Sequence, residues 1–148
     1  MNFTPSNPDF ATVVQASFAR QGLMRMMEAT LDRVEPGAVD ISMPYSESLT
    51  QQHGFMHAAV ITAIADTASG YAALSLMPAG SEVLTVELKV NLLRPAAGTY
   101  FVAEGRVIKP GKTITVSRAD VFARADDGVT TLVATLIATM IAQAGQNN

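Results

Sequence analysis

The chain has 148 residues, of which 49% are hydrophobic and 16% are charged, and its formal net charge is -3. This balance is typical of one folded domain and argues both against a disordered chain and against general nucleic-acid binding, which needs a basic surface. The chain has no cysteine and no apolar run as long as a membrane span, which excludes disulfides, thiolate nucleophiles and cysteine-bound metals and leaves no membrane partner expected.

The first segment, residues 1–8, contains two prolines and should form a loose lead-in without the basic and apolar parts of a signal peptide. We therefore expect a cytoplasmic protein. Over residues 9–28, apolar side chains recur at helical spacing, so a helical region is predicted there. Asp9 is placed as its N-cap, and Gly22 is expected to divide it into two short helices.

Residues 34–43 predict a strand, because apolar side chains alternate with small or polar ones up to Pro44. A polar loop follows over residues 44–56. The segment from His57 to Ala73 then holds seven alanines and one acidic residue, Asp66. Alanine has the highest helix propensity and the segment is almost uncharged, so we expect a helix that is buried on nearly all sides.

After Gly80 the pattern changes to period two, over residues 82–94, 99–108, 113–125 and 130–142. In the first of these segments, the alternation places Thr85 on the polar face with Glu87 and Lys89. Strands joined by such short turns pair antiparallel. The fold class predicted is therefore α+β, with one buried helix in the concave face of a curled antiparallel sheet. Residues 143–148 are expected to form a disordered tail.

The order of elements and three short motifs resemble the hotdog-fold acyl-CoA thioesterases of the PaaI-like, phenylacetic-acid-degradation family. The resemblance covers residues 30–142 and implies one hotdog domain, in which a long central helix is wrapped by the sheet, working without a cofactor. The family's usual His-Gly-Gly appears here as His57-Ala58-Ala59, and its polar asparagine position falls on Gln51. The three motifs are Gly54-Phe55-Met56-His57-Ala58-Ala59, Asp66 nine residues after His57, and Arg94-Pro95-Ala96 at a strand end.

Asp66 is the main candidate for a catalytic side chain. A carboxylate in an apolar, buried helix costs several kcal/mol of folding free energy unless it is partnered or used. Burial should raise the pKa of Asp66, which suits a general base acting on water. The alternative interpretation is an acid that faces a solvent-filled interface or caps a neighbouring loop.

The start of the same helix offers backbone N–H groups that can bind a developing oxyanion. The resemblance gives this role to the N–H of Ala58 and also places His57 in the catalytic site, and the alternative for His57 is an ordinary N-cap of the helix. Nine residues of helix separate His57 from Asp66 by about 13.5 Å, so one chain cannot bring both ends to one carbonyl. If both serve one site, that site lies between two chains. The resemblance implies such a homodimer, and we expect the dimers to pair into a homotetramer.

Further roles follow from the resemblance. Gln51 would orient the attacking water or bind the thioester carbonyl, and the alternative is a solvated loop glutamine. Thr85 would help to hold the water, provided that the polar face of its strand lies at a subunit contact. Gly54 and Ala59 would lie beside the substrate.

Basic side chains gather between residues 89 and 118, where the phosphates of coenzyme A would be attracted. Arg94, Lys109 and Lys112 are the candidates for this contact, although lysines also keep strand edges soluble. His53 and His57 are four residues apart, but no third ligand lies near them in the sequence. No metal site is therefore expected.

The predicted function is hydrolysis of an acyl-CoA to a free acid and CoA, with Asp66 activating water or attacking the thioester directly. Two other functions stay open: a non-catalytic module that binds or senses acyl-CoA, and a hydratase of enoyl thioesters, whose usual Asp and His pairing the sequence lacks. The chain has eight methionines, which favour an apolar, medium- or long-chain acyl group; the candidates for lining it are Met24, Met26, Met27 and Met56.

Overall fold

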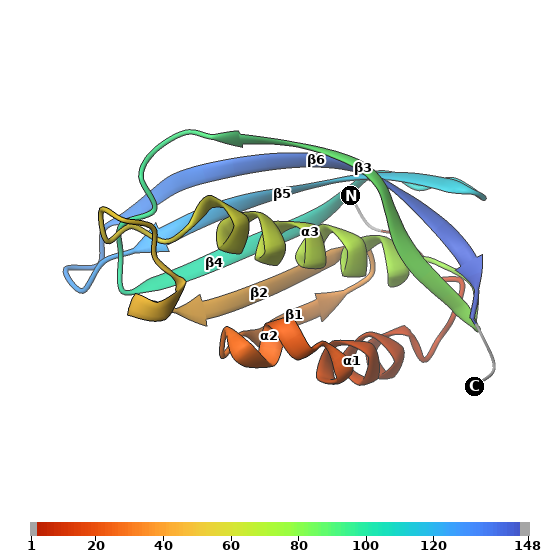
Figure 1. Cartoon of the computed structure of the whole chain (residues 1–148). Coiled ribbons are helices and arrows are strands. Elements are labelled where there is room, and N and C mark those ends of the chain that lie inside the picture. The colour runs from red at the N-terminus through yellow and green to blue at the C-terminus, as the bar shows by residue number, and fades with distance from the viewer. Residues whose placement is uncertain (1–2, 146–148) are drawn as a thin grey trace.

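The computed structural model describes residues 3–145, which form one long helix, two short ones and six strands (Figure 1). The helices are α1 (Phe10–Arg20), α2 (Gly22–Met26) and α3 (Ala58–Leu74), and a 3-10 turn, η1 (Glu47–Leu49), precedes α3. The strands are β1 (Thr30–Glu35), β2 (Ala38–Pro44), β3 (Ser81–Leu92), β4 (Tyr100–Lys109), β5 (Ile114–Arg124) and β6 (Thr130–Ala144).

All six strands belong to one antiparallel sheet with the order β1-β2-β4-β5-β6-β3. The sheet curls around α3, which lies along its concave side, while α1 and α2 pack at the open side below α3 (Figure 1). This arrangement confirms the predicted α+β fold with a long central helix wrapped by a curled antiparallel sheet. Among the described residues, none of the helices combines the length and apolar character that crossing a bilayer requires.

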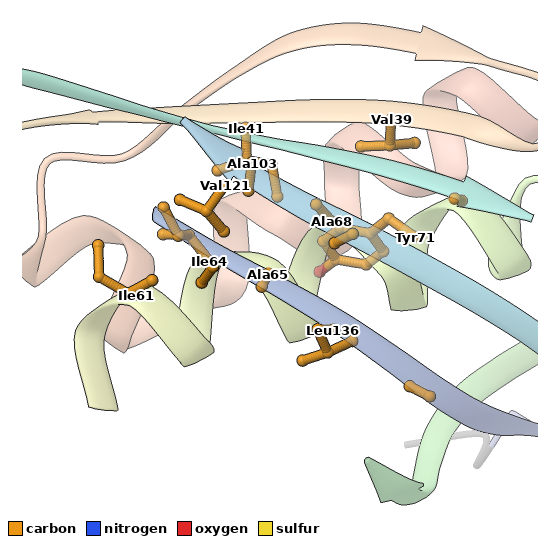
Figure 2. Close-up of a cluster of buried hydrophobic side chains, with 14 of the residues drawn as sticks. Val39, Ile41, Ile61, Ile64, Ala65, Ala68, Tyr71, Ala103, Val121 and Leu136 are labelled. Atoms are coloured by element: carbon orange, nitrogen blue, oxygen red, sulfur yellow. The ribbon is translucent and has the colours of Figure 1, made fainter. Parts of the chain in front are cut away.

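The small residues of α3 let it approach the sheet closely. Figure 2 shows Ile61, Ile64, Ala65, Ala68 and Tyr71 of α3 facing buried side chains of the strands. The strand residues labelled there are Val39, Ile41, Ala103, Val121 and Leu136. At Gly105 of β4, an added Cβ would collide with the backbone of Ala68, so the contact requires glycine at this position. The helix that carries Asp66 is thereby fixed against the middle of the sheet.

The expected single strand over residues 34–43 was wrong, because two strands occupy this region. β1 begins at Thr30, and a tight turn at Pro36-Gly37 leads into β2. β1 is exposed at four of its six positions and carries three charged residues, so its sequence lacks the alternation that identifies a half-buried strand. Its extended conformation is stabilised by pairing with β2.

The predicted boundaries elsewhere differ by a few residues. The break between α1 and α2 lies at Gln21, and Gly22 begins α2. Asp9 occupies the N-cap position of α1, but its side chain makes no capping hydrogen bond. β6 continues to Ala144, two residues into the predicted tail, and residues 146–148 of that tail lie outside the described residues.

Candidate active site

The first turn of α3 has one free backbone donor. His57 is the N-cap residue, and its Nδ1 accepts a hydrogen bond of 3.0 Å from the amide of Ala59. The amides of Val60 and Ile61 both donate to the His57 carbonyl, at 3.0 and 3.2 Å. Over the described part of the chain, the amide of Ala58 is therefore the first-turn donor that has no partner. A helix N-terminus with a free N–H stabilises a negative charge that develops beside it.

This geometry gives His57 a capping role and occupies one of the backbone N–H groups at the start of the helix, that of Ala59. Because His57 uses the Ala59 amide, that amide is not free to bind substrate in this conformation. Ala59 itself is exposed at the mouth of the helix. With the His57 cap in place, the amide of Ala58 is the first-turn N–H that is left to donate to a ligand.

Gln51 lies beside Ala58 in the wall of one pocket of about 460 Å³. Its side-chain oxygen accepts from the amide of His53, so its NH₂ group is the end that can donate to a ligand. The pocket is otherwise mainly apolar, and its remaining walls include Phe55, Met56, Ile61, Leu92, Leu93 and Pro95. A carbonyl oxygen entering here would meet two donors, the Ala58 N–H and the Gln51 amide.

Gly54 shapes the loop that leads into this pocket. Its φ of +81° lies in the left-handed region, which side chains other than glycine rarely adopt, whereas an added Cβ would meet no atom within 4 Å. The turn therefore requires glycine for its backbone conformation, and Gly54 is not among the residues that line this pocket.

Asp66 lies half-buried in a different pocket, of about 280 Å³, between α3, β3 and the start of α2. The Thr85 hydroxyl donates a 2.8 Å hydrogen bond to Asp66 Oδ1. None of the described residues that line this pocket is a lysine, arginine or histidine. Burial raises the pKa of the Asp66 carboxyl, and the hydrogen bond from Thr85 opposes part of that rise. A carboxylate in this state is a stronger base than an exposed one.

Thr85 does not lie on the same face of β3 as Glu87, contrary to the simple alternation. The pairing of β3 with β6 contains a bulge between Thr85 and Glu87, which shifts the pattern by one residue. Thr85 turns inward to Asp66 and lies 3.4 Å from the sulfur of Met140, whereas Glu87 turns outward and accepts from Thr139. The expected polar face was therefore wrong at this residue, and the bulge is the reason.

Within one chain, Ala58 and Asp66 face separate pockets that share no wall residue. Asp66 lies eight positions after Ala58 in α3, which is about 12 Å along the helix axis. Each pocket holds one half of what an acyl transfer needs, either an oxyanion donor or a base. The structure does not bring the two halves together in a single chain.

The basic residues predicted to contact CoA also lie at two separate places in the chain's fold. Arg94 lines the Ala58 pocket and donates to the Leu132 carbonyl at 3.1 Å. Lys109 and Lys112 lie at the other end of the sheet, because β4 starts at Tyr100 near the Ala58 end and finishes at Lys109. Nine steps along that strand amount to about 30 Å. One chain can therefore place Arg94, but neither lysine, beside the same ligand.

A larger pocket, of about 760 Å³, lies at the turn between β1 and β2, away from both halves. Three arginines line it, and each lies beside a carboxylate: Arg33 next to Glu35, Arg106 next to Asp40, and Arg118 at 3.9 Å from Asp120. These side chains form an ion-pair ladder across the outer face of the sheet. His53 is exposed, and the described residues contain no group of three His, Cys, Asp or Glu side chains that could hold a metal.

Gln21 and Tyr71 are among the residues of the Asp66 pocket that were not predicted from the sequence as site residues. Both are polar residues within otherwise apolar helical segments, which is the signal that could have pointed to them. The predicted methionine lining is largely absent from the pockets, because Met24 and Met27 are buried in the core and Met26 is 65% exposed. Of the four candidates, Met56 alone contributes to a pocket wall in the described chain.

Comparison with known proteins identifies the family to which this chain is similar. The model of a family described as "Thioesterase superfamily" matches residues 53–130 of this chain. A thioesterase family protein from Silicibacter pomeroyi is 47% identical, with a TM-score of 0.90 over 92% of this chain and 99% of that one. A Halobacterium salinarum protein, provisionally named as an esterase, is 30% identical over 80% of this chain and 81% of its own length. The PaaI protein of the E. coli phenylacetic acid degradation operon is 18% identical and shares the fold, with a TM-score of 0.81 over 95% of this chain and 98% of that one.

Proposed function

Because this chain belongs to the thioesterase superfamily and is a thioester hydrolase, we propose that it hydrolyses an acyl-CoA to the free acid and CoA at a site formed between two copies of the chain. The observation that carries the proposal is that Ala58 and Asp66 lie at separate positions along α3 and line separate pockets. The Ala58 end has a free N–H but no ionisable side chain in its pocket except Arg94, whereas the candidate base Asp66 lies further along the helix in a separate pocket.

The edge strand β3 supports a two-fold dimer that joins these halves. Within the described residues β3 pairs only with β6, and its free edge carries exposed apolar side chains at Leu84, Val86 and Leu92. Such an edge favours pairing with a second strand. The start of β3 lines the Asp66 pocket through Thr85, and its end lines the Ala58 pocket through Leu92.

Antiparallel pairing of two β3 strands around a two-fold axis near Leu88 would set Thr85 of one copy opposite Leu92 of the other. Each Asp66 would then face the Ala58 pocket of the other copy, twice per dimer. The site would be incomplete in a monomer. Pairing of such dimers into tetramers stays a prediction.

In the proposed reaction, the thioester carbonyl oxygen accepts hydrogen bonds from the Ala58 N–H and the Gln51 amide of one copy. Asp66 of the other copy takes a proton from water, and the water oxygen bonds to the carbonyl carbon. The tetrahedral intermediate then collapses: the carbon–sulfur bond breaks, the electron pair stays on sulfur, and the proton on Asp66 passes to the CoA thiolate. Thr85 would hold the Asp66 carboxylate in position throughout. Direct attack by Asp66 on the carbonyl is the variant route.

The acyl group is proposed to be apolar and of medium or long chain, and the CoA part to lie on the Ala58 side, where Arg94 can contact a phosphate. Lys109 and Lys112 would reach the same CoA only from another copy of the chain. We propose one hotdog domain for the whole chain, acting in the cytoplasm without a cofactor. The first test is release of free thiol from short-, medium- and long-chain and phenylacetyl-CoA, run with the wild type and Asp66→Asn.

The dimer site can be tested by mixing two inactive variants. Ala58→Pro removes the free N–H, and proline is well tolerated at the first position of a helix; the extended His57 before it also suits a proline. Asp66→Asn removes the base. If the site combines Ala58 and Asp66 of different copies, refolding the two variants together should restore about a quarter of wild-type turnover, because half of the dimers are mixed and each has one intact site.

No recovery in the mixed sample, with dimers shown by light scattering, would contradict the shared site. Turnover of every acyl-CoA by Asp66→Asn at the wild-type rate would contradict the proposed base. Absence of turnover in the wild type, with acyl-CoA binding intact, would favour the alternative of a binding module.

A further inference from the structure

A second pocket, which the proposed reaction does not use, lies next to the Asp66 pocket along α3. This second pocket has a volume of about 410 Å³ and lies between α1, the end of α3 and the start of β3. Its walls include the apolar Val13 and Leu74, and the charged Arg20 and Glu82. Gln21, Tyr71 and Val83 line both pockets. The two pockets are therefore compartments on either side of a shared wall.

A hydrogen-bonded chain of three side chains forms that wall. The Gln21 Nε2 donates to the Tyr71 hydroxyl at 2.8 Å, and that hydroxyl donates to Ser17 Oγ at 3.1 Å. Tyr71 is 3% exposed, and its ring packs edge-on against Phe18 with a centroid distance of 6.3 Å. The phenol is thus fixed by its packing, whereas the Gln21 side chain is only partly buried and is held by its hydrogen bond to Tyr71.

The backbone of Gln21 is anchored independently of its side chain. Its N–H donates to the Phe18 carbonyl at 3.0 Å, and its carbonyl accepts from Arg25 at 3.2 Å. Gln21 lies in the break between α1 and α2, and its side chain lines both compartments. Changing this side chain should therefore alter the wall without altering the fold.

The pocket around Asp66 gives the acyl chain a path that leads away from the CoA part. In the proposed site the thioester lies between Ala58 and Asp66, and the CoA part lies on the side of Arg94. The acyl chain then extends past Asp66 into the smaller compartment and toward Gln21. A chain that ends there stays in the compartment of about 280 Å³, and a longer chain must enter the second one.

We propose that Gln21 is a specificity-determining residue, which with Tyr71 closes the far end of the acyl compartment and makes the enzyme select medium-chain over long-chain acyl groups. This inference rests on the proposed function and narrows its acyl class. A long chain must displace the Gln21 amide, which breaks its hydrogen bond to Tyr71 and leaves both polar groups beside apolar carbon. Medium chains reach the wall without this penalty.

The test is the ratio of kcat/KM for palmitoyl-CoA to that for octanoyl-CoA. Gln21→Ala removes both the bulk and the hydrogen bond, and we expect it to raise this ratio about tenfold, the size of effect that the loss of one buried polar barrier gives. Gln21→Asn keeps the amide but shortens the side chain, and should raise the ratio less. Gln15→Ala, at an exposed position of α1, is the matched control and should leave the ratio unchanged.

An unchanged ratio in both Gln21 variants, with octanoyl-CoA still hydrolysed, would overturn this inference and leave the proposed function intact. A wild type that hydrolyses palmitoyl-CoA better than octanoyl-CoA would also overturn it. A wild type that hydrolyses no acyl-CoA would overturn the proposed function, and this inference with it. Thermal unfolding of each variant shows whether it is folded, and Gln21→Asn keeps the test valid if Gln21→Ala is not.

Discussion

Two aspartate–threonine pairs lie on the two sides of the sheet, and their hydrogen bonds are nearly equal. Thr85 donates to Asp66 at 2.8 Å on the concave side, and Thr135 donates to Asp120 at 2.7 Å on the outer face. Their surroundings differ. Asp120 lies 3.9 Å from the Arg118 guanidinium, while no basic side chain of the described residues lines the pocket of Asp66.

The comparison shows that the bond itself does not distinguish a reactive carboxylate from a structural one. Asp120 has a neighbouring positive charge and belongs to a charged outer face. Asp66 is half-buried without a compensating charge, and burial raises its pKa. A base that is poorly stabilised as an anion is better suited to take a proton from water. The environment, rather than the hydrogen bond, therefore separates the two pairs.

The largest expected effect is a difference in kcat between variants of the two aspartates, Asp66 and Asp120. Asp66→Asn should lower kcat by about 10²- to 10⁴-fold, the usual contribution of a general base. Asp120→Asn, which alters the matching acid on the outer face, should leave kcat within about twofold of the wild type, as a surface change away from the site does. Both rates are measured by thiol release with the same acyl-CoA. Equal losses in the two variants would show that the comparison has no catalytic meaning.

The next largest effect is a difference between variants of the two threonines in the pH dependence of kcat/KM. Thr85→Val keeps the side-chain shape but removes the hydrogen bond that favours the ionised Asp66, so the pKa of Asp66 should rise further. Because the base must be ionised, kcat/KM rises with pH through this pKa, and the acid limb of the profile should move to higher pH in the variant. At pH values on the acid limb, we expect kcat/KM of Thr85→Val to be about tenfold lower than that of the wild type.

Thr135→Val is the control, since it removes the same kind of bond from Asp120. Its pH profile should coincide with that of the wild type. A profile of Thr85→Val that also coincides with the wild type would indicate that Thr85 does not act on the ionisation of Asp66.

The smallest effect concerns stability. Because burial raises the pKa of Asp66, the folded chain holds a proton at pH values where the unfolded chain has released it. The unfolded state binds fewer protons in that window, so the free energy of unfolding should fall as the pH rises from the unfolded pKa through the folded one. Asp66→Asn abolishes this contribution and should gain stability, relative to the wild type, above the window.

The measurement is urea unfolding of wild type and Asp66→Asn on both sides of that pH window, with Asp120→Asn as the reference. A difference between wild type and Asp66→Asn that is independent of pH would contradict the raised pKa. A gain in stability together with lost turnover is the behaviour expected of a residue kept for catalysis at a cost to the fold.

Much of the fold was predictable because it depends on neighbours in the chain. The alanine-rich segment forms a helix within one residue of the expected limits, and the four strands after Gly80 appear in the expected order. β1 was not predictable, because its charged, exposed sequence becomes a strand only through pairing with β2. The candidate base was also found from the sequence, since a single acid in an apolar helix requires a partner or a use.

The sequence by itself determined a long buried helix, the acid on it and the histidine that begins it, because propensity, periodicity and charge act over a few residues. Only the tertiary structure decided which groups those residues meet. The bulge in β3 turned Thr85 toward Asp66, nineteen residues away in the chain. The packing of α1 and α2 placed Gln21 beside Tyr71, fifty residues away in the chain. Such contacts join segments that are far apart in sequence, and no local pattern encodes them.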